Sequence, residues 1–179
     1  LSPQQVFSML NKIFSSFDEL VEQHGLEKIK TIGDAYMVAG GLIPGEEDYA
    51  DAMADLALTM RDLLHRDFTV NQMRLEIRTG ICSGPVVAGV VGKKKFTYDL
   101  WGDTVNIASR LTSEGTPGTI QVDETTYRHL RGRYDFAPPQ TLHFKGKGEM
   151  QVYRLLGRCE TSDDLSDTPT AMASQTLGH

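Results

Sequence analysis

Apolar residues recur at helical spacing in two segments near the start of the chain. Ser2, Pro3 and Gln5 predict the start of the first helix, since serine suits the N-cap, proline the first helical position and glutamine the third. Gly25 supplies its stop, and its inward face consists of Val6, Leu10, Ile13, Phe17, Leu20 and Val21. A second amphipathic helix is predicted for residues 47–64, with an inward face of Ala50, Met53, Ala54, Ala57, Met60 and Leu64.

Short apolar runs bounded by turn residues predict the strands. Residues 27–32 and 35–40 surround a tight Gly33-Asp34 turn, which predicts a hairpin. Residues 73–81 alternate in polarity, with Leu75 and Ile77 on the face opposite to Glu76, and predict one strand. Further strands are predicted at 86–91, 96–100 and 119–122, and a terminal hairpin at 140–144 and 150–156.

Two shorter helices are predicted at 104–111 and 124–130, between these strands. Helices and strands in this order predict an α+β sandwich, in which helices cover a mixed sheet. After Cys159 the chain is rich in Ser, Thr, Asp and Gly without an apolar period, so we expect a disordered tail over residues 158–179.

The composition is that of an ordinary globular domain. The chain has 179 residues, of which 40% are hydrophobic and 23% charged, enough for one domain with a real core. A net charge of −6 argues against general nucleic-acid binding. Cys82 and Cys159 have no metal-ligand spacing, and no apolar run is long enough for a membrane span. We therefore expect a cytoplasmic domain, either free or as the cytosolic part of a membrane-anchored parent.

The segment from Phe96 to Arg110 carries the most informative side chains. It places Asp99 at the end of an apolar strand, and Asn106 and Arg110 at i, i+4 on the next helix, near its positive end. Helix N-termini and arginine forks both bind phosphate, so the pattern suggests a nucleotide site. The ordinary alternative is that Asp99 merely ends a strand and Arg110 is a solvated helix charge.

Three more motifs accompany this segment. Residues 28–38 read Lys-Ile-Lys-Thr-Ile-Gly-Asp-Ala-Tyr-Met-Val, residues 83–92 form a glycine-rich link, and residues 144–148 read Phe-Lys-Gly-Lys-Gly. In this order and at these separations, the four motifs resemble the class III nucleotidyl cyclases, the adenylyl and guanylyl cyclase catalytic domain. The resemblance covers about residues 1–157 and is nearest to adenylyl cyclases that work as homodimers.

The resemblance implies a ferredoxin-like core with additional C-terminal α/β elements and a hairpin. It implies a head-to-tail homodimer with two sites across the interface, each converting ATP to 3′,5′-cyclic AMP and pyrophosphate. By resemblance, Asp34 binds two Mg²⁺ or Mn²⁺ ions, Asn106 orients the ribose, Arg110 stabilises charge on the α-phosphate and Lys145 holds the terminal phosphates. On spacing alone, Asp34 is ordinary turn chemistry and Lys145 a solvated turn lysine.

Lys30 and Asp99 fit the adenine base. Adenine offers an N1 acceptor and a 6-amino donor, so its reader needs one donor and one acceptor, whereas guanine reverses both groups. An unpaired buried donor or acceptor costs about 1–3 kcal/mol, so two mismatches give a discrimination of roughly a hundredfold or more. The sequence therefore predicts an adenylyl cyclase, although Lys30 taken alone is an ordinary solvated strand lysine.

One family motif is missing. The family carries its first metal aspartate on a strand ahead of the first helix, and no aspartate before Lys28 replaces it. We expect that the chain is truncated and that the fragment is nearly inactive. Two alternatives stay open: a degenerate, non-catalytic dimerisation module, and a guanylyl or relaxed purine cyclase, which the guanylyl-like residues after Asp34 favour.

Overall fold

The computed structural model describes residues 2–42, 49–70 and 72–159. The predicted start of the second helix at Glu47, and the predicted tail from residue 160 onward, lie outside these residues. None of the helices in the described part of the chain is long and apolar enough to span a membrane. The elements, in chain order, are α1 (Pro3–Gln23), β1 (Glu27–Ile32), β2 (Ala35–Ala39), α2 (Tyr49–Asp67), β3 (Thr69–Val70), β4 (Met73–Arg74), β5 (Thr79–Ile81), β6 (Val87–Val91), β7 (Thr97–Trp101), α3 (Asp103–Ser113), β8 (Ile120–Asp123), α4 (Glu124–Leu130), β9 (Tyr134–Phe136), β10 (Gln140–Phe144) and β11 (Gly148–Arg158).

The first helix begins as the sequence predicts. The Ser2 hydroxyl accepts from the Gln5 amide at 3.2 Å, and the Gln5 side chain accepts from the Ser2 amide at 2.8 Å, which completes a capping box. The buried face of α1 packs with α2 and with β2 in one apolar cluster, whose buried members are Ile13, Phe17, Val21, Leu26, Leu56, Met60 and Leu64.

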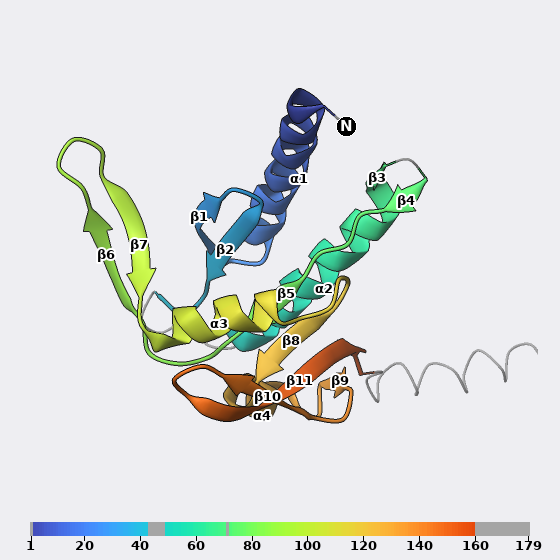
Figure 1. Ribbon diagram of the computed structural model, residues 1–179, viewed down its shortest axis with the longest axis vertical. Helices are drawn as coiled ribbons and strands as arrows, with labels where there is room; N and C mark the ends of the chain where they lie inside the picture. Colours follow the sequence, from blue (N-terminus) through green and yellow to red (C-terminus); the bar gives the residue numbers. More distant parts are fainter. Residues whose placement is uncertain (1, 43–48, 71, 160–179) are drawn as a thin grey trace, which may run out of the picture.

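A five-stranded mixed sheet forms the second half of the domain. Its order is β10-β11-β8-β5, with β9 also paired to β11, and only β5 and β8 run parallel. On one face, Ile120 and Val122 pack with Ala54 and Ala57 of α2 and with α4. On the other face, Leu111 of α3 packs against Phe144 and Val152. Figure 1 shows α3 lying across the molecule between the β6–β7 hairpin and this sheet.

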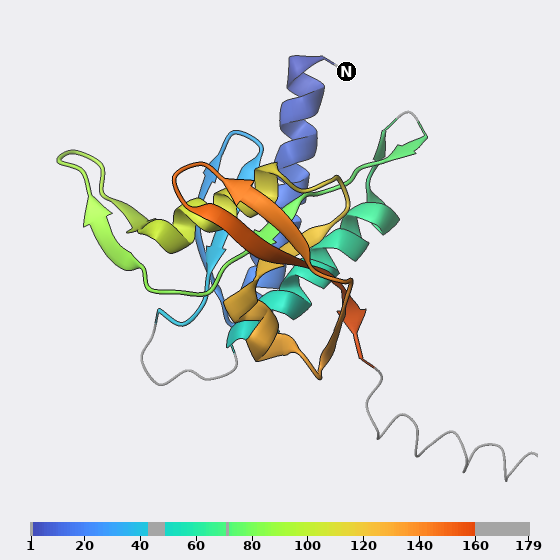
Figure 2. The same ribbon diagram turned by 60° about the horizontal axis from the view of Figure 1, so that its bottom comes forward.

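Three antiparallel hairpins stand apart from that sheet. β1 pairs with β2, β3 with β4, and β6 with β7, each as a separate two-stranded sheet. The β6–β7 hairpin projects from the body of the molecule as an arm in both views (Figures 1 and 2). The predicted α+β class is confirmed, with helices on both faces of the five-stranded sheet.

The single strand predicted for residues 73–81 is wrong. The structure has β4 at Met73–Arg74 and β5 at Thr79–Ile81, with no strand between them. The alternation reflects burial, because Leu75 and Ile77 pack on the α1–α2 cluster, while the Leu75 amide makes a single hydrogen bond to the Phe68 carbonyl at 3.3 Å. The Ile77 carbonyl instead accepts from the Gly118 amide at 2.9 Å. β3 and β9 are short strands that the hydrophobic pattern did not predict.

Candidate active site

Lys30 and Asp99 are brought together from strands far apart in the sequence. The Lys30 ammonium on β1 donates to Asp99 Oδ2 on β7 at 2.8 Å, and the two side chains are 31% and 19% exposed. The Leu100 amide donates to Asp99 Oδ1 at 2.8 Å. These donors hold the pKa of Asp99 below its ordinary 3.8. Asp99 pairs with Gly89 inside β7, so the prediction that it ends its strand is wrong.

The pair still has unused hydrogen-bonding capacity. A lysine ammonium carries three donors, and a carboxylate offers about four acceptor positions. Lys30 spends one donor on Asp99, and Asp99 accepts two hydrogen bonds. A donor and an acceptor therefore remain side by side at a half-exposed position, which suits one edge of a planar heterocycle.

Asn106 and Arg110 lie exposed on α3. They are four residues apart and so share one helical face. Neither side chain forms a hydrogen bond or an ion pair with another residue of the described ranges. Arg110 lies in the last turn of α3, so the predicted help from the positive end of the helix applies to Asn106 only. A ligand held by both would lie along the helix rather than at its tip.

The β10–β11 turn contacts the start of the same helix. Lys145 is exposed in this turn and has no partner among the described residues. Its neighbour Lys147 donates to Asp103, the first residue of α3. Sequence reasoning missed this ion pair, for which the only signals were an acidic first helical residue and a second lysine in the turn. The pair holds the Lys145 turn against the helix that carries Asn106 and Arg110.

A buried network of polar groups connects the five-stranded sheet to the start of α3. Asp123 is 6% exposed, and its Oδ1 accepts from the Thr126 hydroxyl at 2.5 Å and from the Ser83 amide at 3.3 Å. The Ser83 hydroxyl and the Thr126 hydroxyl are 2.7 Å apart. Two residues further on, the Pro85 carbonyl accepts from the Thr104 hydroxyl on α3 at 2.8 Å. The segment from Ser83 to Pro85 is thus hydrogen-bonded to the sheet at one end and to the first turn of the helix at the other.

Two glycines allow the close approach at this junction. A Cβ on Gly84 would lie 2.5 Å from the Thr104 hydroxyl, so the loop fits only without a side chain there. Gly102, which precedes α3, has φ +136° and would place a Cβ 3.4 Å from the Pro85 carbonyl oxygen.

Burial beside Asp123 raises the pKa of the Cys82 thiol to about 12, so this cysteine is inert at neutral pH.

Asp34 stands apart from the other candidates. It is exposed in the β1–β2 turn after Gly33, whose φ is +57°, and forms no hydrogen bond or ion pair with another described residue. Among residues 2–42, 49–70 and 72–159, no group of three or more His, Cys, Asp or Glu side chains could hold a metal ion. Asp34 is a suitable oxygen ligand, but these residues alone do not fit a two-metal site.

Comparisons with known proteins identify the family of this chain. The family described as "Adenylate and Guanylate cyclase catalytic domain" matches residues 1–157. An adenylate cyclase of Mycobacterium tuberculosis is 41% identical over 162 residues, which are 90% of this chain and 37% of the relative. The guanylate cyclase soluble subunit beta-2 of Rattus norvegicus is 40% identical over 174 residues, 96% of this chain and 26% of the relative. The chain thus spans well under half the length of these relatives.

Solved structures of cyclase domains have a similar fold. The guanylate cyclase domain of RhGC from Catenaria anguillulae, in complex with GTP, has a TM-score of 0.83 and 34% identity over 89% of this chain and 87% of that chain. A dimeric guanylyl cyclase domain from Blastocladiella emersonii has a TM-score of 0.80 and 31% identity over 89% and 87% of the two chains. The chain belongs to the class III nucleotidyl cyclases, a family that depends on divalent metal ions.

Proposed function

We propose that this domain is the catalytic domain of an adenylate cyclase, which converts ATP to 3′,5′-cyclic AMP and pyrophosphate. The observation that carries the proposal is the Lys30–Asp99 pair, 2.8 Å apart and half-exposed. Lys30 would donate to adenine N1 and Asp99 would accept from the 6-amino group. Guanine offers a donor and an acceptor in the opposite places, which would set two like groups against each other.

The remaining exposed polar groups suit the rest of the nucleotide. In the reaction the ribose 3′-oxygen bonds to the α-phosphorus, the bond from that phosphorus to the pyrophosphate oxygen breaks, and the 3′-hydroxyl proton is lost. Asn106 would orient the ribose, Arg110 would stabilise negative charge on the α-phosphate, and Lys145 would hold the terminal phosphates. Preorganised donors of this kind contribute about 10²–10³ in rate.

We propose that two chains share each site. Apolar side chains line the β6–β7 arm without cover, with Phe96 74%, Val87 67% and Val90 63% exposed. Exposed apolar surface of this kind commonly marks a protein–protein contact. Asp34 forms no hydrogen bond or ion pair with another described residue, which agrees with its serving a site completed by the partner chain. In a head-to-tail homodimer, Asp34 of one chain would face the nucleotide-binding residues of the other.

The metal requirement limits what the described residues do alone. Asp34 would be one ligand of the Mg²⁺ or Mn²⁺ ions, and the described residues bring no group of three or more such side chains together around it. We therefore propose that this chain binds nucleotide but turns it over very slowly.

Guanylate cyclase activity is the second candidate. It is favoured by the 40% identity to the rat guanylate cyclase subunit and by the structural likeness to a domain bound to GTP. Lys30 and Asp99 would match the hydrogen-bonding groups of adenine and mismatch those of guanine. The preference for ATP or GTP therefore separates the two candidates.

An assay of cyclic nucleotide formation from equal ATP and GTP tests the proposal. It uses the complete protein with Mn²⁺, and a parallel measurement compares the affinity of the printed chain for the two nucleotides. Cyclic AMP as the dominant product, with tighter ATP binding, is the expected result. Cyclic GMP as the dominant product would keep the reaction and overturn the base assignment. No product at dimer-forming concentrations would indicate a non-catalytic module.

A further inference from the structure

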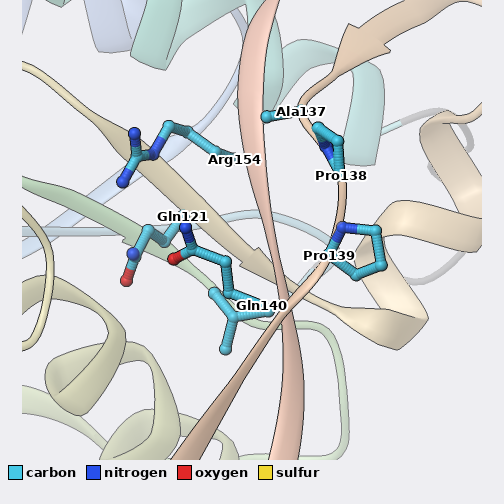
Figure 3. A pocket seen from close by; sticks show the side chains of 7 residues that line it. Gln121, Ala137, Pro138, Pro139, Gln140 and Arg154 are labelled. Atoms are coloured by element: carbon cyan, nitrogen blue, oxygen red, sulfur yellow. The ribbon is translucent and has the colours of Figure 1, made fainter.

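A cavity of about 300 Å³ lies on the five-stranded sheet, beside the segment that joins β9 to β10 (Figure 3). Ala137, Pro138 and Pro139 line it from the connecting segment and form an apolar wall, and Gln121, Gln140, Val152 and Arg154 line it from the strands. We refer to it as the Gln121 cavity. It lies at the start of β10, whereas Lys145 follows the end of that strand.

Strand register explains why the polar groups meet there. Arg154 of β11 pairs with Gln121 of β8, and Val152 of β11 pairs with Gln140 of β10. Residues two apart on a strand share a face, so these four side chains project from one side of the sheet. Figure 3 shows Gln121, Gln140 and Arg154 gathered on that side of β11.

The polar groups of the cavity have no partners in the described part of the chain. Gln121 is 3% exposed, and its buried Oε1 accepts no hydrogen bond. The half-buried Arg154 guanidinium forms no ion pair or hydrogen bond with another described residue. The other buried side-chain atoms without a partner, in His65 and Thr79, do not line this cavity. Native proteins rarely leave a buried acceptor such as the Gln121 oxygen unsatisfied.

The unmet groups define the ligand that would fit. An arginine fork matches a planar carboxylate through two hydrogen bonds. The Gln121 oxygen needs a donor, such as a hydroxyl next to that carboxylate, and the proline wall favours a short apolar body. Inorganic phosphate would satisfy Arg154 but would leave the apolar wall without contact. We propose that the Gln121 cavity binds a small 2-hydroxy carboxylate, with its carboxylate on Arg154 and its hydroxyl donating to Gln121 Oε1.

Mandelate is a suitable probe, because phenylacetate is the same molecule without the hydroxyl. We would titrate each into the ¹⁵N-labelled full chain and follow the side-chain amides of Gln121 and Gln140 and the Nε–H of Arg154. Saturable shifts confined to this cavity are expected, with mandelate binding several-fold more tightly than phenylacetate. Arg154→Met keeps the apolar stem and should weaken mandelate binding about tenfold or more.

Two further variants test whether the effect is specific to this cavity and to the hydroxyl group. Arg78→Ala removes an exposed arginine elsewhere and should leave mandelate binding unchanged. Gln121→Met keeps the side-chain length and should abolish the preference for mandelate over phenylacetate. Unaltered backbone spectra would show that each variant is folded. Absence of saturable shifts, or equal affinity of the wild-type chain and Arg154→Met, would overturn the proposal. Equal affinity of the wild-type chain for both probes would overturn the role of Gln121.

Discussion

The five-stranded sheet and the β6–β7 arm both contain apolar antiparallel strand pairs, but the sheet buries its apolar side chains and the arm exposes several of them. In the sheet, Phe144 is 1% exposed and Val152 3%, because α3 covers them. In the arm, Phe96 is 74% exposed and Val87 67%. The sheet buries these side chains within one chain, whereas Phe96 and Val87 of the arm stay exposed and only its base is covered, where Leu100 is 6% exposed.

The candidate residues follow the same division. Asp123, which supports α3, is buried and accepts hydrogen bonds from Ser83 and Thr126. Arg110 and Lys145, which would touch the nucleotide, are exposed and have no partners in the described ranges. Within the described residues, the single chain thus positions α3 through buried hydrogen bonds and leaves the side chains that would face the ligand without partners. This difference is one reason why we propose a site shared by two chains.

The same substitution in both regions gives the largest contrast. Phe144→Ala should cost about 3–5 kcal/mol of the free energy of unfolding, because it leaves a cavity beneath α3. Phe96→Ala should change that free energy by less than about 0.5 kcal/mol, since the ring is exposed in the single chain. Urea denaturation at low protein concentration measures both. Similar costs for the two variants would show that the arm is covered within one chain.

The arm should instead control association. Phe96→Ala removes an exposed aromatic ring, and the few interface residues that dominate binding cost about 2 kcal/mol or more when truncated, so we expect the dimer dissociation constant to rise about tenfold or more. Sedimentation equilibrium over a concentration series checks this. Lys94→Ala, at the tip of the same hairpin, is the matched control and should change the constant far less. An unchanged constant in Phe96→Ala would remove the arm from the interface.

The β10–β11 turn offers a smaller test. Lys147→Ala breaks the exposed pair with Asp103 and should cost no more than about 1 kcal/mol of stability. Because the pair holds the Lys145 turn against α3, ATP affinity should still fall a few-fold. Lys145→Ala should reduce ATP affinity more and leave stability unchanged. The turn has no role in binding phosphate if both variants bind ATP as the wild-type chain does.

The Lys30–Asp99 pair predicts the smallest effect, through pH. Hydrogen bonds from Lys30 and Leu100 lower the Asp99 pKa in the folded state below its ordinary 3.8. The pair's contribution to stability is therefore fully present above pH 3.8 and is lost as pH falls through the lower folded value. The difference in unfolding free energy between wild type and Asp99→Asn should stay constant from neutral pH down to about pH 3.8 and shrink below it. A difference that already shrinks near neutral pH would contradict the pairing.

Local signals predicted most of the fold. The capping residues Ser2 and Gln5, the Gly33-Asp34 turn and the helical periodicity each act over a few residues, and the structure has the elements that they predict. The strand predicted for 73–81 failed because alternation reports burial and does not reveal whether a neighbouring strand is present. Family resemblance, rather than spacing, linked Lys30 to Asp99, and the structure places them in contact. The Lys147–Asp103 pair and the Asp123 network depend on tertiary contacts that no local pattern contains.

The most direct test of the shared site is to mix two inactive variants of the complete protein. Asp34→Ala should remove the metal-binding role and Arg110→Ala the charge stabilisation, each leaving little activity alone. In a mixed dimer, one of the two sites would combine an intact Asp34 from one chain with an intact Arg110 from the other. The account predicts that cyclic AMP formation returns on mixing and rises with protein concentration. Mixtures that stay as inactive as the separate variants, although mixed dimers form, would contradict a site built from two chains.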